Sequence, residues 1–269
     1  MSNSEKEFFF IRAICAAMAA GREALKIYEA PGSDFEVEYK ADHSPLTIAD
    51  KVSHRIIADA LLCTGIPLLS EEGQQVPYEE RRKWSRFWLI DPIDGTKEFI
   101  KRNGEFTVNI ALLENNSPVL GVIYVPVSRE LYFGIVGRGA WRKQHAGMPD
   151  QLEELIAGAE ILPVVESSGE LRVLCSRSYQ DARTDCFLSR LRIQHPEMKL
   201  IHRGSSLKLG MVASGEADLY PRFGTTMEWD TAAGHALLLA VGKNLFQSDQ
   251  LTPLVYNKAN LENPSFIAC

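Results

Sequence analysis

The order of apolar and polar segments predicts an α+β fold for this chain of 269 residues. Two strand-like segments, 106–113 and 119–125, follow one another directly, and a third at 131–136 comes next. Helical patterns precede this group at 50–63 and follow it at 184–191. Neighbouring antiparallel strands between helical segments are typical of α+β proteins, whereas strict alternation of strand and helix would favour a Rossmann-like sheet.

Composition bounds the function without identifying it. With 45% hydrophobic residues, the chain can bury a sizeable core and fits one large domain or two closely packed halves. The net charge of −6 argues against a nucleic-acid polymer as partner, and we expect the basic runs 81–83 and 101–102 to be solvated surface. The five cysteines are odd in number and form no C-x-x-C pair, which favours a reducing cytoplasm over a disulfide framework.

The first half of the chain opens with an amphipathic pattern from residue 8 to residue 27, which predicts a packed first helix. Glu5 and Glu7 precede its apolar run and Arg12 interrupts it, so we expect neither a signal peptide nor a membrane span. The further elements expected here are a helix at 50–63, a strand at 87–90, a hairpin of 106–113 and 119–125 that turns at Asn115 and Asn116, and a strand at 131–136.

The polar segment 143–169 has the weakest pattern in the chain. We therefore place a boundary there, between an N-terminal half at 1–150 and a C-terminal half at 151–269. The elements expected in the second half are strands at 172–175 and 218–222 and helices at 184–191, 206–214 and 231–241.

The most informative motif places two carboxylates, Asp91 and Asp94, where an apolar strand meets a glycine turn. We expect Pro92 and Gly95 to break the strand and Thr96 to cap the helix that follows. The start of a helix at this point would direct free backbone N–H groups at a phosphate.

Two further acidic groups stand at the edges of apolar segments: Glu71 with Glu72, and Asp230 directly before the small-residue helix. Taken singly, an Asp-Gly pair is an ordinary turn, Asp230 is an N-cap and the glutamates are a solvated pair. Together they favour a site for Mg²⁺, Mn²⁺ or Ca²⁺, because carboxylates and carbonyls bind hard cations whereas zinc and copper recruit His or Cys. The six histidines show no ligand spacing, and the chain lacks the G-x-S-x-G and P-loop motifs.

These motifs carry a family resemblance. Three of them, in this order, resemble the inositol monophosphatase superfamily of magnesium-dependent, lithium-sensitive phosphatases: Glu71-Glu72, Asp91-Pro92-Ile93-Asp94-Gly95-Thr96 and Trp229-Asp230-Thr231-Ala232-Ala233-Gly234. Segments 40–50, 94–109, 204–208, 220–224 and 263–266 resemble its branch of 3′(2′),5′-bisphosphate nucleotidases, the CysQ type. The resemblance runs from about Lys40 to the C-terminus and implies a layered αβαβα sandwich.

The resemblance also implies a set of metal ligands. Glu71, Asp91 and the backbone carbonyl of Ile93 would hold a first ion, and Asp91, Asp94 and Asp230 a second. The N-terminal half then carries most of the ligands, and the C-terminal half supplies Asp230. The implied cofactor is Mg²⁺, with two or three ions, Mn²⁺ as an alternative, and Li⁺ and Ca²⁺ as inhibitors.

In the family, a threonine hydroxyl orients the attacking water, so the resemblance assigns catalytic roles to Thr96, to Asp50 behind it and to Glu71 nearby. Attack is direct, without a phosphoenzyme. The substrate contacts implied are Asp94, Gly95, Thr96, Ser205, Lys208, Arg222 and Asp230, with Lys208 and Arg222 meeting the phosphate that is not cleaved. From the residues alone, Thr96 could equally be a helix cap. Lys208 and Arg222 could equally be a solvated pair on the surface. Tyr179 stands where the branch has His.

The function that the resemblance implies is hydrolysis of adenosine 3′,5′-bisphosphate to AMP and phosphate, a reaction linked to sulfur assimilation, with 3′-phosphoadenylyl sulfate as a further substrate. The alternatives are an inositol monophosphatase, a fructose-1,6-bisphosphatase, and a regulatory binding protein without catalysis. The expected partner is a small nucleotide bisphosphate. Both a monomer and a homodimer fit, as do a cytoplasmic location and peripheral association with the cytoplasmic side of the inner membrane.

Overall fold

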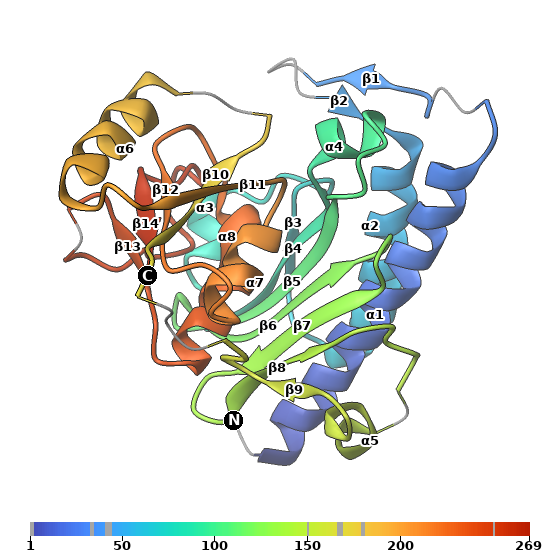
Figure 1. The fold of residues 1–269 in the computed structure, drawn as a ribbon. Helices are drawn as coiled ribbons and strands as arrows, with labels where there is room; N and C mark the ends of the chain where they lie inside the picture. The colour runs from blue at the N-terminus through green and yellow to red at the C-terminus, as the bar shows by residue number, and fades with distance from the viewer. Residues whose placement is uncertain are drawn as a thin grey trace.

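A seven-stranded sheet forms the centre of the N-terminal part of the protein (Figure 1). The computed structural model describes residues 3–32, 35–40, 45–149, 151–165, 169–178, 181–249 and 251–269. The strands lie in chain order: β3 (Leu68–Ser70), β4 (Arg86–Asp94), β5 (Thr107–Glu114), β6 (Ser117–Val125), β7 (Glu130–Ile135), β8 (Gly139–Lys143) and β9 (Glu160–Ile161). The β3–β4 pair is parallel and the other five pairs are antiparallel.

Two long helices, α1 (Asn3–Glu29) and α2 (Ile48–Leu61), cover one face of this sheet (Figure 1). Phe10 and Ile14 of α1 pack in one apolar cluster with Trp88 and Phe133 of the strands. The expected first helix is therefore confirmed as an amphipathic helix that buries one face. Within the described ranges, none of the helices combines the length and the apolar character that a bilayer crossing requires.

The other face of the sheet is covered by α7 (Leu207–Ala213) and α8 (Glu228–Ala240). Both helices are apolar nearly all round, because a further layer of strands covers their outer side. That layer comprises β10 (Arg172–Ser176) paired in parallel with β11 (Lys199–Arg203), and a sheet of β12 (Tyr220–Arg222), β14 (Phe266–Ala268) and β13 (Leu245–Gln247). The helix α6 (Ala182–Gln194) lies outermost, which completes the expected αβαβα sandwich.

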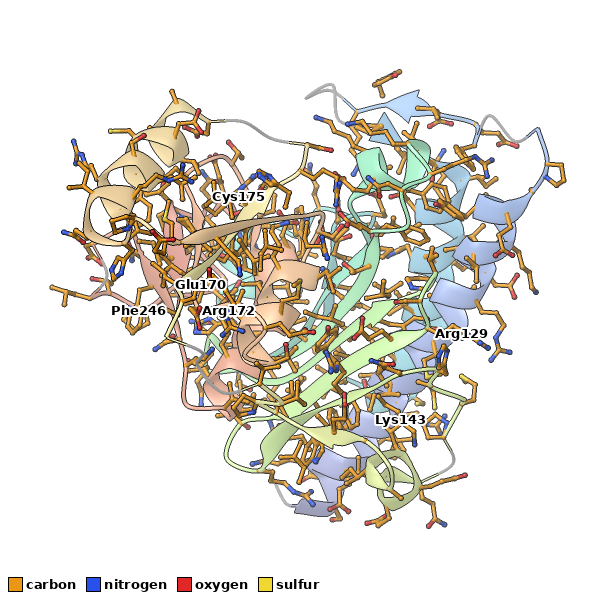
Figure 2. The ribbon with its side chains drawn as sticks, viewed as in Figure 1. Arg129, Lys143, Glu170, Arg172, Cys175 and Phe246 are labelled. Atoms are coloured by element: carbon orange, nitrogen blue, oxygen red, sulfur yellow. The ribbon has the colours of Figure 1, made fainter. Side chains whose placement is uncertain are left out.

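The strand layer is tied together by side chains as well as by backbone pairing. Arg172 at the start of β10 donates to both carboxylate oxygens of Asp218, at 3.0 and 2.8 Å, and Asp218 leads into β12. Figure 2 shows Glu170 and Arg172 side by side in this layer. These bonds join β10 to the segment that leads into β12.

The hairpin and most of the helices match expectation. Asn115 and Asn116 both have positive φ, 50° and 61°, which suits the two-residue turn between β5 and β6. Several short elements were not anticipated: β1 (Glu38–Tyr39), β2 (Pro45–Leu46), the 3-10 turn η1 (Leu62–Thr64), β3, α3 (Tyr78–Arg81), α5 (Leu152–Ile156), β8, β9, β11, β13 and β14. The boundary near residue 150 stays a prediction.

Two expectations at the acidic motif are wrong in detail. Pro92 does not end the strand, because β4 continues to Asp94 with a register shift between Asp91 and Asp94. A bulge tolerates proline since it leaves a backbone position without a ladder partner. Helix α8 begins at Glu228, so Asp230 lies within its first turn and not before it.

Close contact between α8 and the sheet depends on Gly121 of β6. A Cβ atom there would lie 2.2 Å from the carbonyl oxygen of Ala233 on α8. We expect Gly121→Ala to lower the free energy of unfolding by about 3 kcal/mol, since the backbone must move to relieve the clash.

The measurement is urea denaturation of Gly121→Ala beside Gly147→Ala. Within the described part of the chain, no heavy atom beyond the chain neighbours lies within 4 Å of a Cβ at exposed Gly147. Equal stability of the two variants would contradict the packing of α8 described here.

Candidate active site

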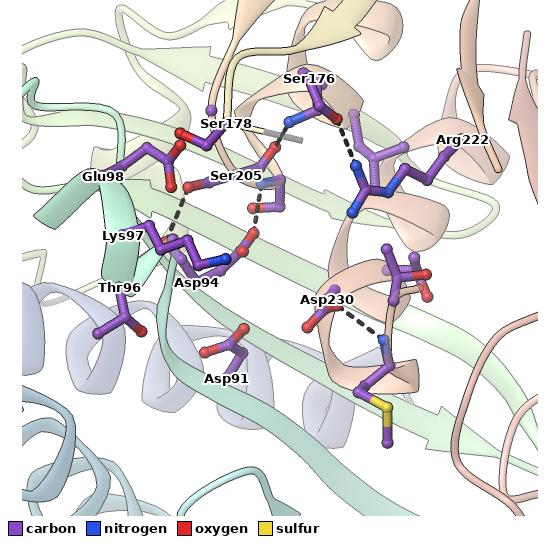
Figure 3. A pocket seen from close by; sticks show the side chains of 18 of the residues that line it. Asp91, Asp94, Thr96, Lys97, Glu98, Ser176, Ser178, Ser205, Arg222 and Asp230 are labelled. Atoms are coloured by element: carbon purple, nitrogen blue, oxygen red, sulfur yellow. Dashed lines mark hydrogen bonds between the residues drawn. The ribbon is translucent and has the colours of Figure 1, made fainter. Parts of the chain in front are cut away.

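Two aspartates of β4 and one of α8 converge at the end of β4. One carboxylate oxygen from each of Asp91, Asp94 and Asp230 lies within 4.8 Å of the others. Residues three apart on a regular strand point to opposite faces, so the bulge between Asp91 and Asp94 is what brings both to one side. Figure 3 shows these carboxylates facing the same space, with Asp230 reaching it from α8.

Amide donors orient the three carboxylates. Asp91 Oδ1 accepts from the backbone N–H of Ile93 at 3.1 Å, and Asp230 Oδ2 accepts from that of Met227 at 2.8 Å. Asp94 Oδ2 accepts from the N–H of Ser206 and, at 3.4 Å, from the side-chain amide of Asn109. Each carboxylate therefore has at least one N–H donor that fixes its orientation.

Burial makes this cluster costly in the ionised form. Burial raises the pKa of Asp91 well above its usual value, and the nearby charges of Glu71 and Asp94 raise it further. The pKa of Asp230 is raised by burial and then by Asp94 and Glu71. Burial also raises the pKa of Asp94, against the opposing charge of Lys208. An all-oxygen donor set with excess negative charge fits a hard divalent cation such as Mg²⁺ or Mn²⁺.

Glu71 lines the same pocket but its carboxylate is engaged elsewhere. The parallel pairing of β3 with β4 places it there, since its N–H donates to the carbonyl of Ile90 at 3.1 Å. Lys40 Nζ bridges Glu71, at 2.7 Å, and Glu72. Burial would lower the pKa of Lys40, but the two glutamates outweigh it and the pKa is raised. The structure thus brings Glu71 to the site without adding it to the cluster of three.

Thr96 is not a helix cap. It is the first residue of α4 (Thr96–Ile100), and Gly95, with φ 90°, occupies the N-cap position. The Thr96 hydroxyl lies 3.3 Å from Asp50 Oδ1 and 3.4 Å from the carbonyl oxygen of Ile93. The expected proximity of Thr96 and Asp50 is present, and the carbonyl of Ile93 lies near the same hydroxyl.

Asp50 is only 2% exposed, although its sequence position suggested an exposed helix residue. Its Oδ2 accepts from the backbone N–H and the hydroxyl of Thr47, at 2.8 and 2.5 Å. Burial raises its pKa to about 6, while the bonds from Thr47 lower it. Asp50 is therefore ionised at neutral pH and available as an acceptor for Thr96.

The opposite side of the 410 Å³ pocket is formed by the C-terminal half. Lys208, 4% exposed, donates to the carbonyls of Ser205 and Arg203 at 2.7 and 3.2 Å and lies 5.1 Å from the centre of the Tyr220 ring. Arg222 donates to Ser176 Oγ at 2.7 Å (Figure 3). Both cations line the pocket and are buried, so the interpretation as a solvated pair is wrong.

Gly95 and Ser205 meet across the two halves. A Cβ at Gly95 would lie 2.1 Å from Ser205 Oγ, so glycine is needed there for space as well as for its positive φ. Ser205 Oγ is also within 2.9 Å of the carbonyl of Asp94, its acceptor. Ser205 itself has φ 51°, which is uncommon for a residue with a side chain.

Sequence patterns did not identify several residues that support the site. Asn109 and Ser206 act on Asp94, and only the register of β5 against β4 and the fold of the second half bring them there. Asn109, Ser206 and Lys40 all lie within segments that resemble the nucleotidase branch, at 94–109, 204–208 and 40–50, and this resemblance was the available signal. Tyr179 lies outside the described residues.

Comparison with known proteins identifies the family. A model of the inositol monophosphatase family matches residues 6–265. The 3′(2′),5′-bisphosphate nucleotidase CysQ of Escherichia coli O157:H7 is 43% identical over 253 residues, which cover 93% of this chain and 95% of the relative. The protein of that name from Haemophilus influenzae is 33% identical over 264 residues, covering 97% and 92%. The crystal structure of CysQ from Bacteroides thetaiotaomicron has a TM-score of 0.91 at 48% identity and covers 97% of both chains.

The repulsion within the acidic cluster predicts how stability responds to pH. The folded state holds the pKa of Asp91, Asp94 and Asp230 above the unfolded value, so it binds more protons than the unfolded chain. In chelator, we therefore expect this cluster's contribution to the free energy of unfolding to fall as the pH rises from about 4, the ordinary pKa of an aspartate, to about 8. Mg²⁺ at about 100 times its Kd should restore about 2.7 kcal/mol.

Thermal unfolding with and without Mg²⁺ at both pH values checks this expectation. Asp91→Asn serves as the matched variant and should show a flatter pH dependence and a weaker response to Mg²⁺. A melting temperature that Mg²⁺ leaves unchanged at the higher pH would contradict the metal site.

Proposed function

The chain belongs to the inositol monophosphatase family, and from this premise we propose that it hydrolyses adenosine 3′,5′-bisphosphate to AMP and phosphate, with 3′-phosphoadenylyl sulfate as a further substrate. The observation that carries the proposal is one pocket with two kinds of charge. Asp91, Asp94 and Asp230 meet within 4.8 Å on one side, and the buried cations Lys208 and Arg222 stand on the other. A substrate with two phosphates uses both sides. The names and coverage of the CysQ relatives support the same substrate class.

Enzymes of this family are metal-dependent, generally with Mg²⁺. In the proposal, Asp91, Asp94 and Asp230 hold one ion, and Glu71 with Asp91 and the carbonyl of Ile93 holds another. When bound, the ions supply positive charge to the phosphate and leaving oxygens and acidify a water molecule. A third ion, the use of Mn²⁺, and inhibition by Li⁺ and Ca²⁺ belong to the same proposal.

The chain's own residues then orient the reactants. The Thr96 hydroxyl donates to the Asp50 carboxylate, which leaves the lone pairs of Thr96 to accept a hydrogen bond from the attacking water. Because Asp50 is buried against Thr47, this alignment is fixed before substrate arrives. Glu71 lies at the edge of the same space and can accept a proton from the water.

The phosphate that is cleaved is held in the proposal by the amides of Gly95 and Thr96, which line the pocket. The first N–H groups of a helix have no acceptor within the helix, so they are suited to phosphate oxygens. With only five residues in α4, these local donors matter and the helix dipole contributes little.

Lys208 and Arg222 favour a nucleotide bisphosphate over a polyol phosphate. Two desolvated cations in the pocket suit a second anionic group, whereas inositol offers hydroxyls there. Inositol monophosphatase or fructose-1,6-bisphosphatase activity is the second candidate, because the metal side of the pocket serves any phosphate monoester. A binding role without catalysis is disfavoured by the complete acidic cluster.

Phosphate release from adenosine 3′,5′-bisphosphate, inositol 1-phosphate and fructose 1,6-bisphosphate tests the proposal, with Mg²⁺ and with Li⁺ added. We expect strong preference for the nucleotide and loss of activity in Li⁺. Preference for inositol or sugar phosphate would contradict the nucleotide assignment, and no turnover of any substrate would favour the binding protein.

The variant that accompanies this panel is Asp94→Asn, for which we expect a fall in kcat on the order of 10² or more, as for other groups acting at the transition state. Asp59→Asn, the same change at an exposed position of α2, is the matched control and should keep wild-type activity. An unchanged rate in Asp94→Asn would sink the catalytic role of the cluster.

A further inference from the structure

The segment 203–206, which runs from the last residue of β11 to the start of α7 and is called the 203–206 loop below, forms much of the nucleotide side of the pocket. Two carboxylates of the N-terminal half hold its backbone. Asp94 Oδ2 accepts from the N–H of Ser206, and Glu105 Oε2 accepts from the N–H of Gly204 at 2.7 Å. Asp94 belongs to the acidic cluster, but Glu105 has no part in the chemistry described above.

Glu105 also forms a two-pronged ion pair with Arg177, which follows β10. Arg177 Nε lies 2.8 Å from Oε2 of Glu105, and its terminal nitrogen lies 2.8 Å from Oε1. The same terminal nitrogen lies 3.1 Å from the carbonyl oxygen of His202, at the end of β11. The hydrogen bonds that Arg177 donates to Glu105 raise the pKa of Arg177 above its ordinary value. Planar pairs of this kind fix direction as well as distance.

The backbone around these contacts is tightly packed. The Ser205 hydroxyl has two possible acceptors. One is the carbonyl of Glu105, at 2.5 Å, and the other is the carbonyl of Asp94. A Cβ at Gly204 would lie 2.7 Å from Cγ of Glu98 and 3.0 Å from the carbonyl oxygen of Glu105. A shift of Glu105 would therefore move the Gly204 end of the 203–206 loop, while Asp94 holds the Ser206 end.

Arg177, Gly204 and Ser205 line the pocket, and Glu105, whose side chain is 15% exposed, holds all three from behind. We propose that Glu105 is a positioning residue that sets nucleotide specificity, because it fixes Arg177 and the 203–206 loop against the acidic cluster. This inference rests on the proposed nucleotide substrate. It assigns to Glu105 an effect on the binding of the nucleoside part of the substrate. Cleavage of a phosphate monoester without a nucleoside should not depend on Glu105.

The test is the variant Glu105→Gln, which keeps the size of the side chain but replaces one acceptor oxygen by an amide donor. That donor would face Arg177 or the N–H of Gly204, so one of the two contacts is lost. For adenosine 3′,5′-bisphosphate we expect KM to rise on the order of tenfold, the effect of one hydrogen bond to a charged group. For p-nitrophenyl phosphate we expect kcat/KM to change by less than about twofold.

Glu114→Gln is the matched control. Glu114 pairs with Arg86 at 2.7 Å across β4 and β5, with side chains 26% and 33% exposed, at the far end of the sheet from the acidic cluster. This variant loses an Arg–Glu pair that lies outside the pocket. We expect KM for the nucleotide and kcat/KM for p-nitrophenyl phosphate to equal the wild-type values. Equal loss of activity on both substrates in Glu105→Gln would indicate a general structural role and overturn the proposal.

A double-mutant cycle with Arg177→Gln gives the sharper readout. If Glu105 acts through Arg177, the effects of the two substitutions on the logarithm of KM are not additive. Additive effects on the logarithm of KM would contradict the proposal. Should Glu105→Gln fail to fold, Arg177→Lys keeps the charge but loses the two-pronged geometry, and it must also raise KM for the nucleotide. A wild-type protein without preference for the nucleotide would instead refute the proposed function, so the two failures are distinguishable.

Discussion

The mutual repulsion of three buried carboxylates is the constraint on which the rest of this structure depends. Asp91 is 1% exposed and lies among other negative charges, a position that is unfavourable unless positive charge is supplied. The protein supplies part of it through backbone N–H groups, which donate to Asp91, Asp94 and Asp230. In the proposed function a divalent cation supplies the remainder, which would link folding, pH and metal binding through a single cluster.

The cluster joins parts of the chain that lie far apart in the sequence. Asp91 and Asp94 come from the central sheet, whereas Asp230 comes from the first turn of α8. The start of α8 is fixed by Glu228, which is fully buried and accepts from the N–H groups of Asn257 and Lys258 at 2.6 and 3.0 Å and from Lys258 Nζ at 2.6 Å. The segment before β14 thus helps to place Asp230, although it lies far from Asp91 in the sequence.

Sequence reasoning succeeded where a local pattern has one physical meaning. The amphipathic first helix, the hairpin with its turn at Asn115 and Asn116, and the position of Asp91 and Asp94 at a strand end are of this kind. It failed where burial is decided by distant segments. Arg81 was expected on the surface, but it is 3% exposed and binds Asn257 Oδ1 at 2.8 Å, a contact 176 residues away.

In the candidate site, too, burial by distant segments was not predicted from local sequence. From the residues alone, Asp50 was an exposed helix position and Lys208 a solvated cation, and only the family resemblance assigned them to the site. Their burial comes from Thr47 in one case and from the 203–206 loop with Tyr220 in the other. The bulge in β4 and the early start of α8 were not foreseen, because both depend on tertiary contacts that propensity does not encode.

The central claim is that Asp91, Asp94 and Asp230 bind a divalent cation. The most direct measurement is a crystal structure of the protein soaked in Mn²⁺, with anomalous diffraction recorded at the manganese absorption edge. The account predicts an anomalous peak in contact with all three carboxylates. A peak elsewhere, or none in a crystal where the three carboxylates keep their positions, would contradict it.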